Sequence, residues 1–284
     1  MPGYGVFGFL LILIINLAVP LSLFKTGVFV KYYFPFIWLG FVLFVDSLVY
    51  KFRGNSLIKN DFRKFINLFA VSILFWAVFH LISGCVQLWV CGRIQGFSPV
   101  EYFILSSIVF SFVLPAIFEV SDLIGALTSF SLRTKRLSPQ RLFLYLMILL
   151  GVASFIFPIF NPGFTFPLIW VSLFLIFDPI NYLKGQPSII KYMFKSEWEV
   201  PISLLISGAV CGFFWEFWNL WAYPKWSRAV PFFDFYRTFD VALGGYIFYF
   251  FFAWELFAMY HFIRFIGRSY LAAGVNFIKR RIRR

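Results

Sequence analysis

Apolar runs, each about as long as a membrane-crossing helix, follow one another along almost the whole chain. A helix needs roughly 20 apolar residues to cross the hydrocarbon layer, and eight such stretches can be drawn. Because 61% of the residues are hydrophobic and only 13% are charged, the chain also departs from soluble domains, which are about 45–50% apolar. The sequence therefore predicts an all-α, polytopic transmembrane bundle. The expected spans are residues 6–24, 28–50, 66–90, 100–130, 142–160, 165–182, 200–220 and 240–265.

The fourth span is too long for one straight crossing. Pro115 lies near its middle, and a proline removes a helix hydrogen bond and clashes with the preceding turn, so we expect a kink or break there. Membrane strands are not expected, because these runs exceed the roughly ten residues of a barrel strand and are apolar on every face.

Basic residues orient the expected bundle. Of the 25 Lys and Arg residues, 19 fall on one side of an eight-span arrangement. Because basic loops stay in the cytoplasm, both termini are expected there, in a cell (inner or plasma) membrane. The N-terminal run lacks a basic leader and a small-residue cleavage site, so it is taken as the first span. The six basic residues on the other side are Lys25, Lys31, Arg93, Lys225, Arg228 and Arg237.

The net charge of +13 raises the question of a nucleic-acid partner, for which the tail 279–284 (KRRIRR) is the best candidate. Topology and contact with anionic lipid headgroups explain the basic loops and this tail more simply. Anionic headgroups are therefore the expected partners, and nucleic acid is not.

The chain resembles itself across its midpoint. FVDSLVYKFRGNSLIK (residues 44–59) and IFDPINYLKGQPSIIK (176–191) match at their polar positions with an offset of 132 residues. A duplicated four-span unit keeps its orientation, so the sequence predicts two parallel repeats, 1–132 and 133–284, with a site between them. The matched pairs are Asp46 and Asp178, Tyr50 and Tyr182, Ser56 and Ser188, Lys59 and Lys191, and, with a small gap, Glu119 and Glu255.

Six acidic side chains fall inside the expected spans. Asp46 and Asp178 lie near the cytoplasmic boundary and are expected to tie helix ends to the basic loops. For the deeper acids, a functional role and a buried structural hydrogen bond both remain open. An ionised carboxylate that faces lipid costs several kcal/mol, so these side chains should face the bundle interior. The deeper acids are Glu119, Asp122, Glu216 and Glu255.

Glu216 is the leading site candidate, within CGFFWEFWNLWAYPKW (211–226). Asn219 shares its helix face at i+3 and is a candidate hydrogen-bond partner. A group on the eighth span, from the segment around Glu255 or Tyr260, is expected opposite, because a short loop joins spans seven and eight. The tryptophans expected to screen the carboxyl group are Trp215, Trp218 and Trp226.

Few residues could hold a cofactor. His80 and His261 lie too far apart along their helices to share a haem; His80, in the outer half of its span, is a candidate ligand contact. The three cysteines show no C-x-x-C spacing, and nucleotide, zinc-protease and serine-hydrolase motifs are missing from the sequence. No metal or cofactor is expected.

Trp215-Glu216, then Trp226, then a Phe-rich helix with Glu255 follow one another here, and Pro115 with Glu119 is similar in the first half. This order resembles the integral-membrane lycopene cyclases of carotenoid synthesis, although the chain has no Glu-Glu pair. In that family a carboxyl group protonates a polyene to drive ring closure. The resemblance implies that Glu216 and Glu255 act as acid and base, with Glu119 as a related carboxyl group.

Three functions follow from these patterns. The first is binding or modification of a very apolar, isoprenoid-like lipid at an intramembrane carboxylate between the repeats, with cyclase or isomerase chemistry as its enzymatic form. The second is a non-catalytic membrane subunit that anchors or assembles a larger complex with partner subunits. The third, a cation-coupled transporter, would need a polar path along the acids.

Overall fold

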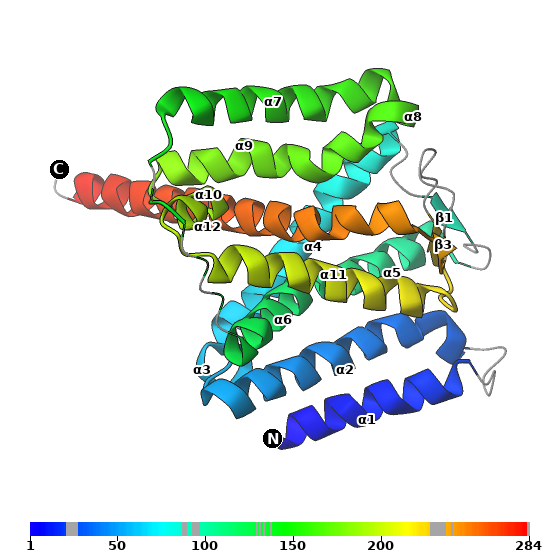
Figure 1. Cartoon of the computed structure of the whole chain (residues 1–284). Coiled ribbons are helices and arrows are strands. Elements are labelled where there is room, and N and C mark those ends of the chain that lie inside the picture. The colour runs from blue at the N-terminus through cyan, green and yellow to red at the C-terminus, as the bar shows by residue number, and fades with distance from the viewer. Residues whose placement is uncertain are drawn as a thin grey trace.

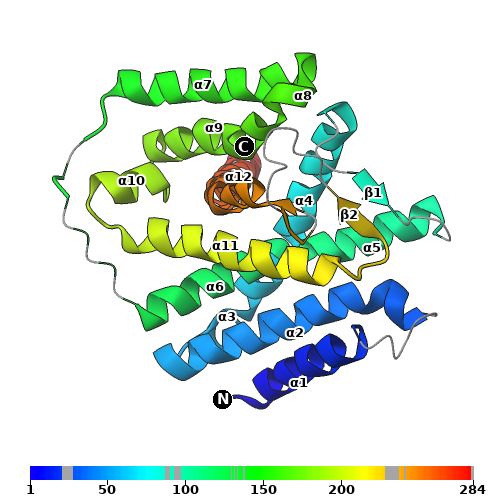
Figure 2. The ribbon, with the colours of Figure 1, turned by 45° about the vertical axis from the view of Figure 1, so that its right-hand side comes forward.

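The computed structural model describes residues 1–20, 28–86, 90–92, 97–128, 130, 132, 134–136, 138–227, 237–239 and 241–282. The fold is all-helical, as the sequence predicts. The main helices pack side by side in the order α7, α9, α12, α11, α6, α2 and α1, with α4 crossing behind them (Figure 2). They are α1 (Gly3–Ala18), α2 (Val28–Arg53), α3 (Leu57–Asn60), α4 (Phe62–Val86), α5 (Pro99–Ser111), α6 (Val113–Leu127), α7 (Arg141–Phe160), α8 (Pro162–Thr165), α9 (Ile169–Leu183), α10 (Ile189–Phe194), α11 (Glu199–Asn219) and α12 (Ile247–Ile282), with 3₁₀ turns η1 (Phe166–Leu168) and η2 (Leu243–Tyr246).

Five helical segments among the described residues are long and apolar enough to cross a membrane. Two shorter apolar helices, Gly3–Ala18 and Ile169–Leu183, accompany them. The outermost helices, α1 and α7, keep large apolar side chains such as Ile14 and Leu149 exposed (Figure 2). Soluble proteins rarely expose such continuous apolar surface, so this architecture is consistent with an integral membrane protein. The five segments are Lys31–Arg53, Phe62–Ser83, Pro99–Leu127, Arg141–Phe160 and Glu199–Asn219.

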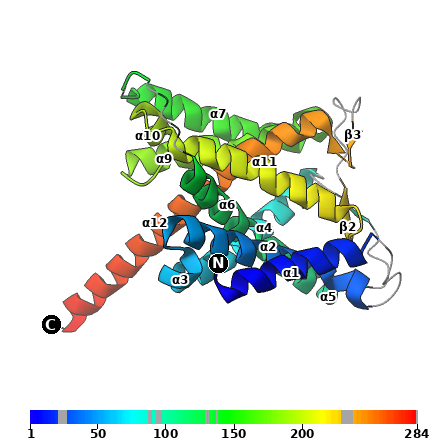
Figure 3. The same ribbon diagram turned by 60° about the horizontal axis from the view of Figure 1, so that its bottom comes forward.

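The two ends of the bundle differ. At one end, β1 (Val90–Gly92) pairs antiparallel with β2 (Lys225–Ser227), near the short β3 (Arg237–Thr238) and β4 (Val241–Ala242) (Figure 1). The chain start, α3, α10 and the end of α12 lie toward the other end (Figure 1). The last turns of α12 project beyond the neighbouring helices (Figure 3). Part of the expected interfacial segment, residues 228–236, lies outside the described residues.

The expected break in the fourth span occurs at Phe112, three residues before Pro115. Ser72 of α4 stabilises this break, since its Oγ donates to the Phe110 carbonyl (2.6 Å) and accepts from the Leu114 N–H (3.2 Å). Pro115 itself stands in the first turn of α6, where its missing N–H removes no helix hydrogen bond. The helix therefore ends upstream of the proline, and a neighbouring hydroxyl bonds to backbone groups on both sides of the break.

Asp46 near the end of α2 binds the start of the short helix α3. Its carboxylate accepts hydrogen bonds from Ser56 Oγ (2.8 Å), the Ile58 N–H (3.0 Å) and Tyr4 Oη (2.5 Å). Ser56 in turn caps α3 by accepting from the Lys59 N–H. These donors satisfy the carboxylate without any contribution from the lysines of the loop, so Asp46 orders the connection between α2 and α4.

Asp178 makes the same arrangement between α9 and α10. It accepts from Ser188 Oγ (3.0 Å) and from the N–H groups of Ile189 (2.7 Å) and Ile190 (2.9 Å), and Ser188 caps α10 through the Lys191 N–H. Both aspartates therefore tie helix ends to the following segment, as expected, but through backbone and hydroxyl donors instead of basic side chains.

Candidate functional site

A cavity of about 100 Å³ lies where α4, α5 and α6 meet α11 and α12. Residues from both expected halves line it. Its walls are almost entirely apolar, and their aromatic members include Trp38, Trp76, Phe110, Trp215, Trp226 and Phe252.

Glu216 is the one acidic side chain among the described residues that line this cavity. It is 4% exposed, and it accepts a short hydrogen bond from Tyr249 Oη on α12. The expectation that Glu216 faces the interior and bonds to a group on the last span thus agrees with the structure. The expected segment around Glu255 or Tyr260 was wrong, because the partner lies nearer the start of the helix.

Tyr249 reaches Glu216 because α11 and α12 approach very closely. A Cβ atom at Gly212 would collide with the Tyr249 ring, and one at Gly208 would collide with the Tyr249 carbonyl group. Trp254 closes the same interface further along, with its Nε1 donating to the Pro201 carbonyl (2.9 Å). The two glycines therefore allow the phenol to lie flat against α11, one turn from the carboxyl group.

Asn219 does not bond to Glu216 as expected. Its side chain accepts from the Trp226 N–H (3.0 Å) and donates to the Trp226 carbonyl group. This pair of bonds fixes the chain after α11 so that the Trp226 ring, which is 6% exposed, lines the cavity. Asn219 therefore positions a wall residue and does not itself line the cavity.

The three candidate tryptophans have different surroundings. Trp215 lines the cavity between Trp38 and Trp226, with ring centroids 5.8 and 5.9 Å away. Trp218 faces α1 and α2 instead: its Nε1 donates to Asn16 Oδ1 (3.1 Å). Trp215 and Trp226 are therefore wall residues, whereas Trp218 is a packing residue that anchors α11.

Glu255 and Glu119 do not join Glu216 in the cavity. Glu255 is fully buried against α9, where it accepts from the Leu173 N–H (3.0 Å). Glu119 is fully buried beside Asp46, and neither of its carboxyl oxygens has a hydrogen-bond partner among the described residues. Glu216 and Glu255 thus lack the shared space that an acid and base acting on one ligand would need. Asp122 lies nearer the surface and pairs with Arg53 (3.3 Å).

His80 and Tyr260 also lie away from the cavity. His80 is exposed on the outside of α4, where it stacks on Trp76 with ring centroids 4.9 Å apart. Tyr260 is buried against Phe118 of α6 and accepts from Arg264 (3.3 Å). Their candidate role as ligand contacts at the Glu216 site does not match this placement.

Among the described residues, no group of three or more His, Cys, Asp or Glu side chains could hold a metal ion. Cys211 is a buried free thiol that lines the cavity. The side chains of Cys85 and Cys91 lie outside the described part.

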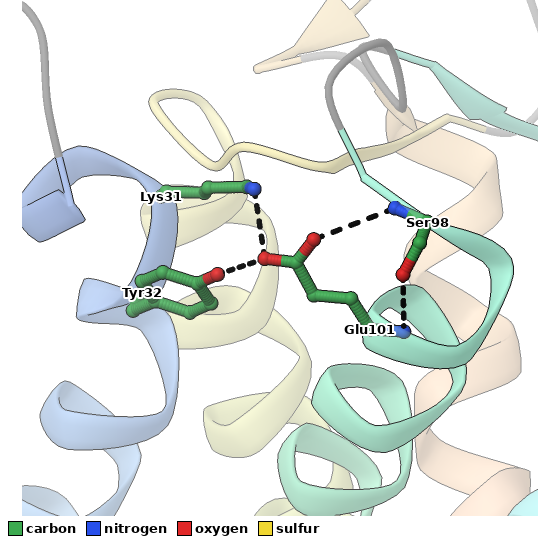
Figure 4. Close-up of polar contacts among 4 residues, drawn as sticks. All are labelled: Lys31, Tyr32, Ser98 and Glu101. Carbon is green, nitrogen blue, oxygen red and sulfur yellow. Dashed lines mark hydrogen bonds and ion pairs between the residues drawn. The ribbon is translucent and has the colours of Figure 1, made fainter.

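Sequence reasoning missed Tyr249 and Trp38, which carry no local signal because they stand among many similar aromatic residues. It also missed a polar cluster at the strand-bearing end, where Glu101 accepts from Lys31 Nζ (2.8 Å), Tyr32 Oη and the Ser98 N–H (Figure 4). The S-x-x-E capping box at Ser98 and Glu101 was a readable signal for this contact.

Comparison with family models, with curated proteins and with solved structures found no match for this chain. The functional argument therefore rests on the cavity and the groups that face it.

Proposed function

We propose that this protein is an eight-span membrane protein that binds a very apolar, isoprenoid-like lipid in the cavity between its two halves. The observation that carries the proposal is a cavity with aromatic walls whose one described acidic group, Glu216, is held by Tyr249. Such sites, mostly apolar with a few placed polar groups, are typical of ligand binding.

The eight spans would be the five long helical segments, the shorter α1 and α9, and α12. Helix α12 has 36 residues, so it is about 54 Å long, well beyond the roughly 30 Å of a hydrocarbon layer. An even number of crossings is supported by the ends of the bundle. The loop after α4 and the loop after α11 meet through β1 and β2, while both termini lie toward the opposite end (Figure 1).

Two structural matches at one offset support the duplication. The Asp46 and Asp178 arrangements lie 132 residues apart. In addition, a Cβ atom at Gly8 of α1 would lie 2.6 Å from the carbonyl oxygen of residue 40 in α2, and one at Gly151 of α7 would lie 2.9 Å from that of residue 172 in α9. The crossing points of these two helix pairs therefore obey the same offset, which favours two parallel repeats with the ligand between them.

The size of the cavity limits what it admits. Its volume of about 100 Å³ is of the order of an engineered apolar cavity of about 150 Å³ that takes up benzene. The cavity therefore suits a ring or one end of a long lipid, and the rest of the molecule would extend between helices into the bilayer.

The carboxyl group would contact the inserted end of the lipid. In the enzymatic form of the proposal, Glu216 donates a proton to the ligand and Tyr249 orients the carboxyl group; general acid catalysis of this kind typically contributes 10²- to 10⁴-fold, an order-of-magnitude value. Isoprenoid cyclase or isomerase chemistry would be of this class.

Purification in mild detergent, followed by mass spectrometry of extracted lipids, tests the binding proposal. We expect one apolar lipid to co-purify, and Glu216→Leu or Tyr249→Phe to reduce its amount. Glu197→Gln, at an exposed loop position, is the control. Co-purification of fixed partner proteins without such a lipid would favour the complex-anchoring function instead.

Glu216→Gln separates binding from chemistry, because the amide keeps the shape of the side chain but has no titratable proton. Retained lipid that is no longer converted would indicate an acid, whereas unchanged lipid content and composition would leave a binding role.

A further inference from the structure

Two tryptophans that line the cavity have indole N–H groups without a hydrogen-bond partner among the described residues: Trp38 on α2 and Trp226 on β2. Both are almost completely buried, with 2% and 6% of their surface exposed. Buried indole N–H groups usually find an acceptor, since leaving one unpaired costs free energy. Two such donors in the wall of one cavity indicate a missing acceptor.

The rigid packing of both rings leaves little room for them to find an acceptor elsewhere in the protein. Trp38 packs edge to face against Phe41 (5.4 Å between centroids) and Trp218 (5.1 Å). Trp226 is held at its backbone by Asn219 on both its N–H and its carbonyl group. An acceptor therefore has to come to the indoles.

Other polar groups of the wall already have partners. Ser72 Oγ bridges Phe110 and Leu114, and Tyr249 Oη donates to Glu216. The unmet capacity that can be identified in the described wall is thus for donation, and a pure hydrocarbon would leave both indoles unpaired.

We propose that the ligand carries a hydrogen-bond-accepting oxygen on the ring or chain end that enters the cavity, as in a quinone or other cyclic ketone, and that Trp38 and Trp226 donate to it. This inference rests on the proposed function and specifies the chemical class of its ligand. The indoles would select a carbonyl-bearing lipid over a hydrocarbon of the same shape.

A matched pair of small probes tests the inference. Tetramethyl-1,4-benzoquinone carries two carbonyl oxygens on a single ring, and 1,2,4,5-tetramethylbenzene is a hydrocarbon of similar size. Binding of each to the detergent-purified, delipidated protein is measured from the probe-dependent rise of the thermal unfolding temperature. Trp38→Phe and Trp226→Phe keep an aromatic ring but remove the N–H, and Trp254→Phe, whose Nε1 bonds to Pro201 outside the cavity wall, is the control.

The wild-type protein and Trp254→Phe should bind the quinone more tightly than the hydrocarbon. Each cavity variant should lose up to about tenfold of that preference, the size expected of one neutral hydrogen bond, while its affinity for the hydrocarbon stays within about twofold. Equal binding of both probes in the wild type, or a preference that survives in both cavity variants, would refute the carbonyl assignment and leave the proposed cavity intact. Failure of both probes to bind the wild type would count against the proposed function as well.

Discussion

The ring of Tyr249 occupies the space that a side chain at Gly212 would need. This contact sets the depth at which α12 packs on α11, and it brings the tyrosine hydroxyl to Glu216 one turn further along α11. A glycine on one helix thus determines whether the acidic group of the cavity has its partner.

Gly212→Ala should therefore damage the site through packing alone. The added methyl group must displace the Tyr249 ring, and overpacking of this kind typically costs about 1–3 kcal/mol. We expect a lower thermal unfolding temperature and loss of the co-purifying lipid. Gly267→Ala is the matched control, because a Cβ atom there meets no neighbouring atom within 4 Å. Normal lipid content in Gly212→Ala would show that the Tyr249 contact is dispensable.

Asp46→Ala and Asp178→Ala should destabilise the protein by similar amounts. Each change leaves buried donors at the start of a short helix unpaired, at about 1–3 kcal/mol per orphaned group. Chemical denaturation in detergent measures the free energy of unfolding. Asp61→Ala, which removes an exposed hydrogen bond to the Lys64 N–H, should cost clearly less. Strongly unequal effects at the two aspartates would argue against equivalent repeats.

Ser72→Ala should destabilise the broken span. The hydroxyl serves the Phe110 carbonyl and the Leu114 N–H, so its removal leaves both groups of the break without this partner and should cost about 1–3 kcal/mol. Ser107→Ala is the control, because that exposed hydroxyl bonds only within its own helix, to Phe103. Thermal unfolding of the two variants compares them directly, and equal stability would mean that water replaces the hydroxyl.

Reporter fusions in the 91–99 and 221–238 loops should both report the outer side of the membrane. The expectation combines the excess of basic residues at the opposite end with the pairing of β1 and β2, which requires the two loops to share one side. A cytoplasmic signal from both loops would invert the orientation. Opposite signals from the two would contradict the strand pairing itself.

The sequence alone determined the helical segments and several of their connections. Apolar length located the helices, since an apolar run of this size has no other stable form in a bilayer. The polar matches at Asp46 and Asp178 identified two connections that adopt the same hydrogen bonds, because a carboxylate and a serine ten residues apart encode a local capping geometry. The short loop between spans seven and eight predicted that α11 and α12 pack together.

Only the tertiary structure decided which faces of the helices meet. A helix that is apolar all round carries no periodic signal for its inward face, so His80 on α4 and Glu255 on α12 could not be distinguished from cavity residues by pattern. Their rotation depends on where backbones can approach, as at Gly212, and on bonds between distant segments, such as those from Asn219 to Trp226. The sequence thus placed Glu216 inside the bundle, while its pairing with Tyr249 followed from helix packing that no single segment encodes.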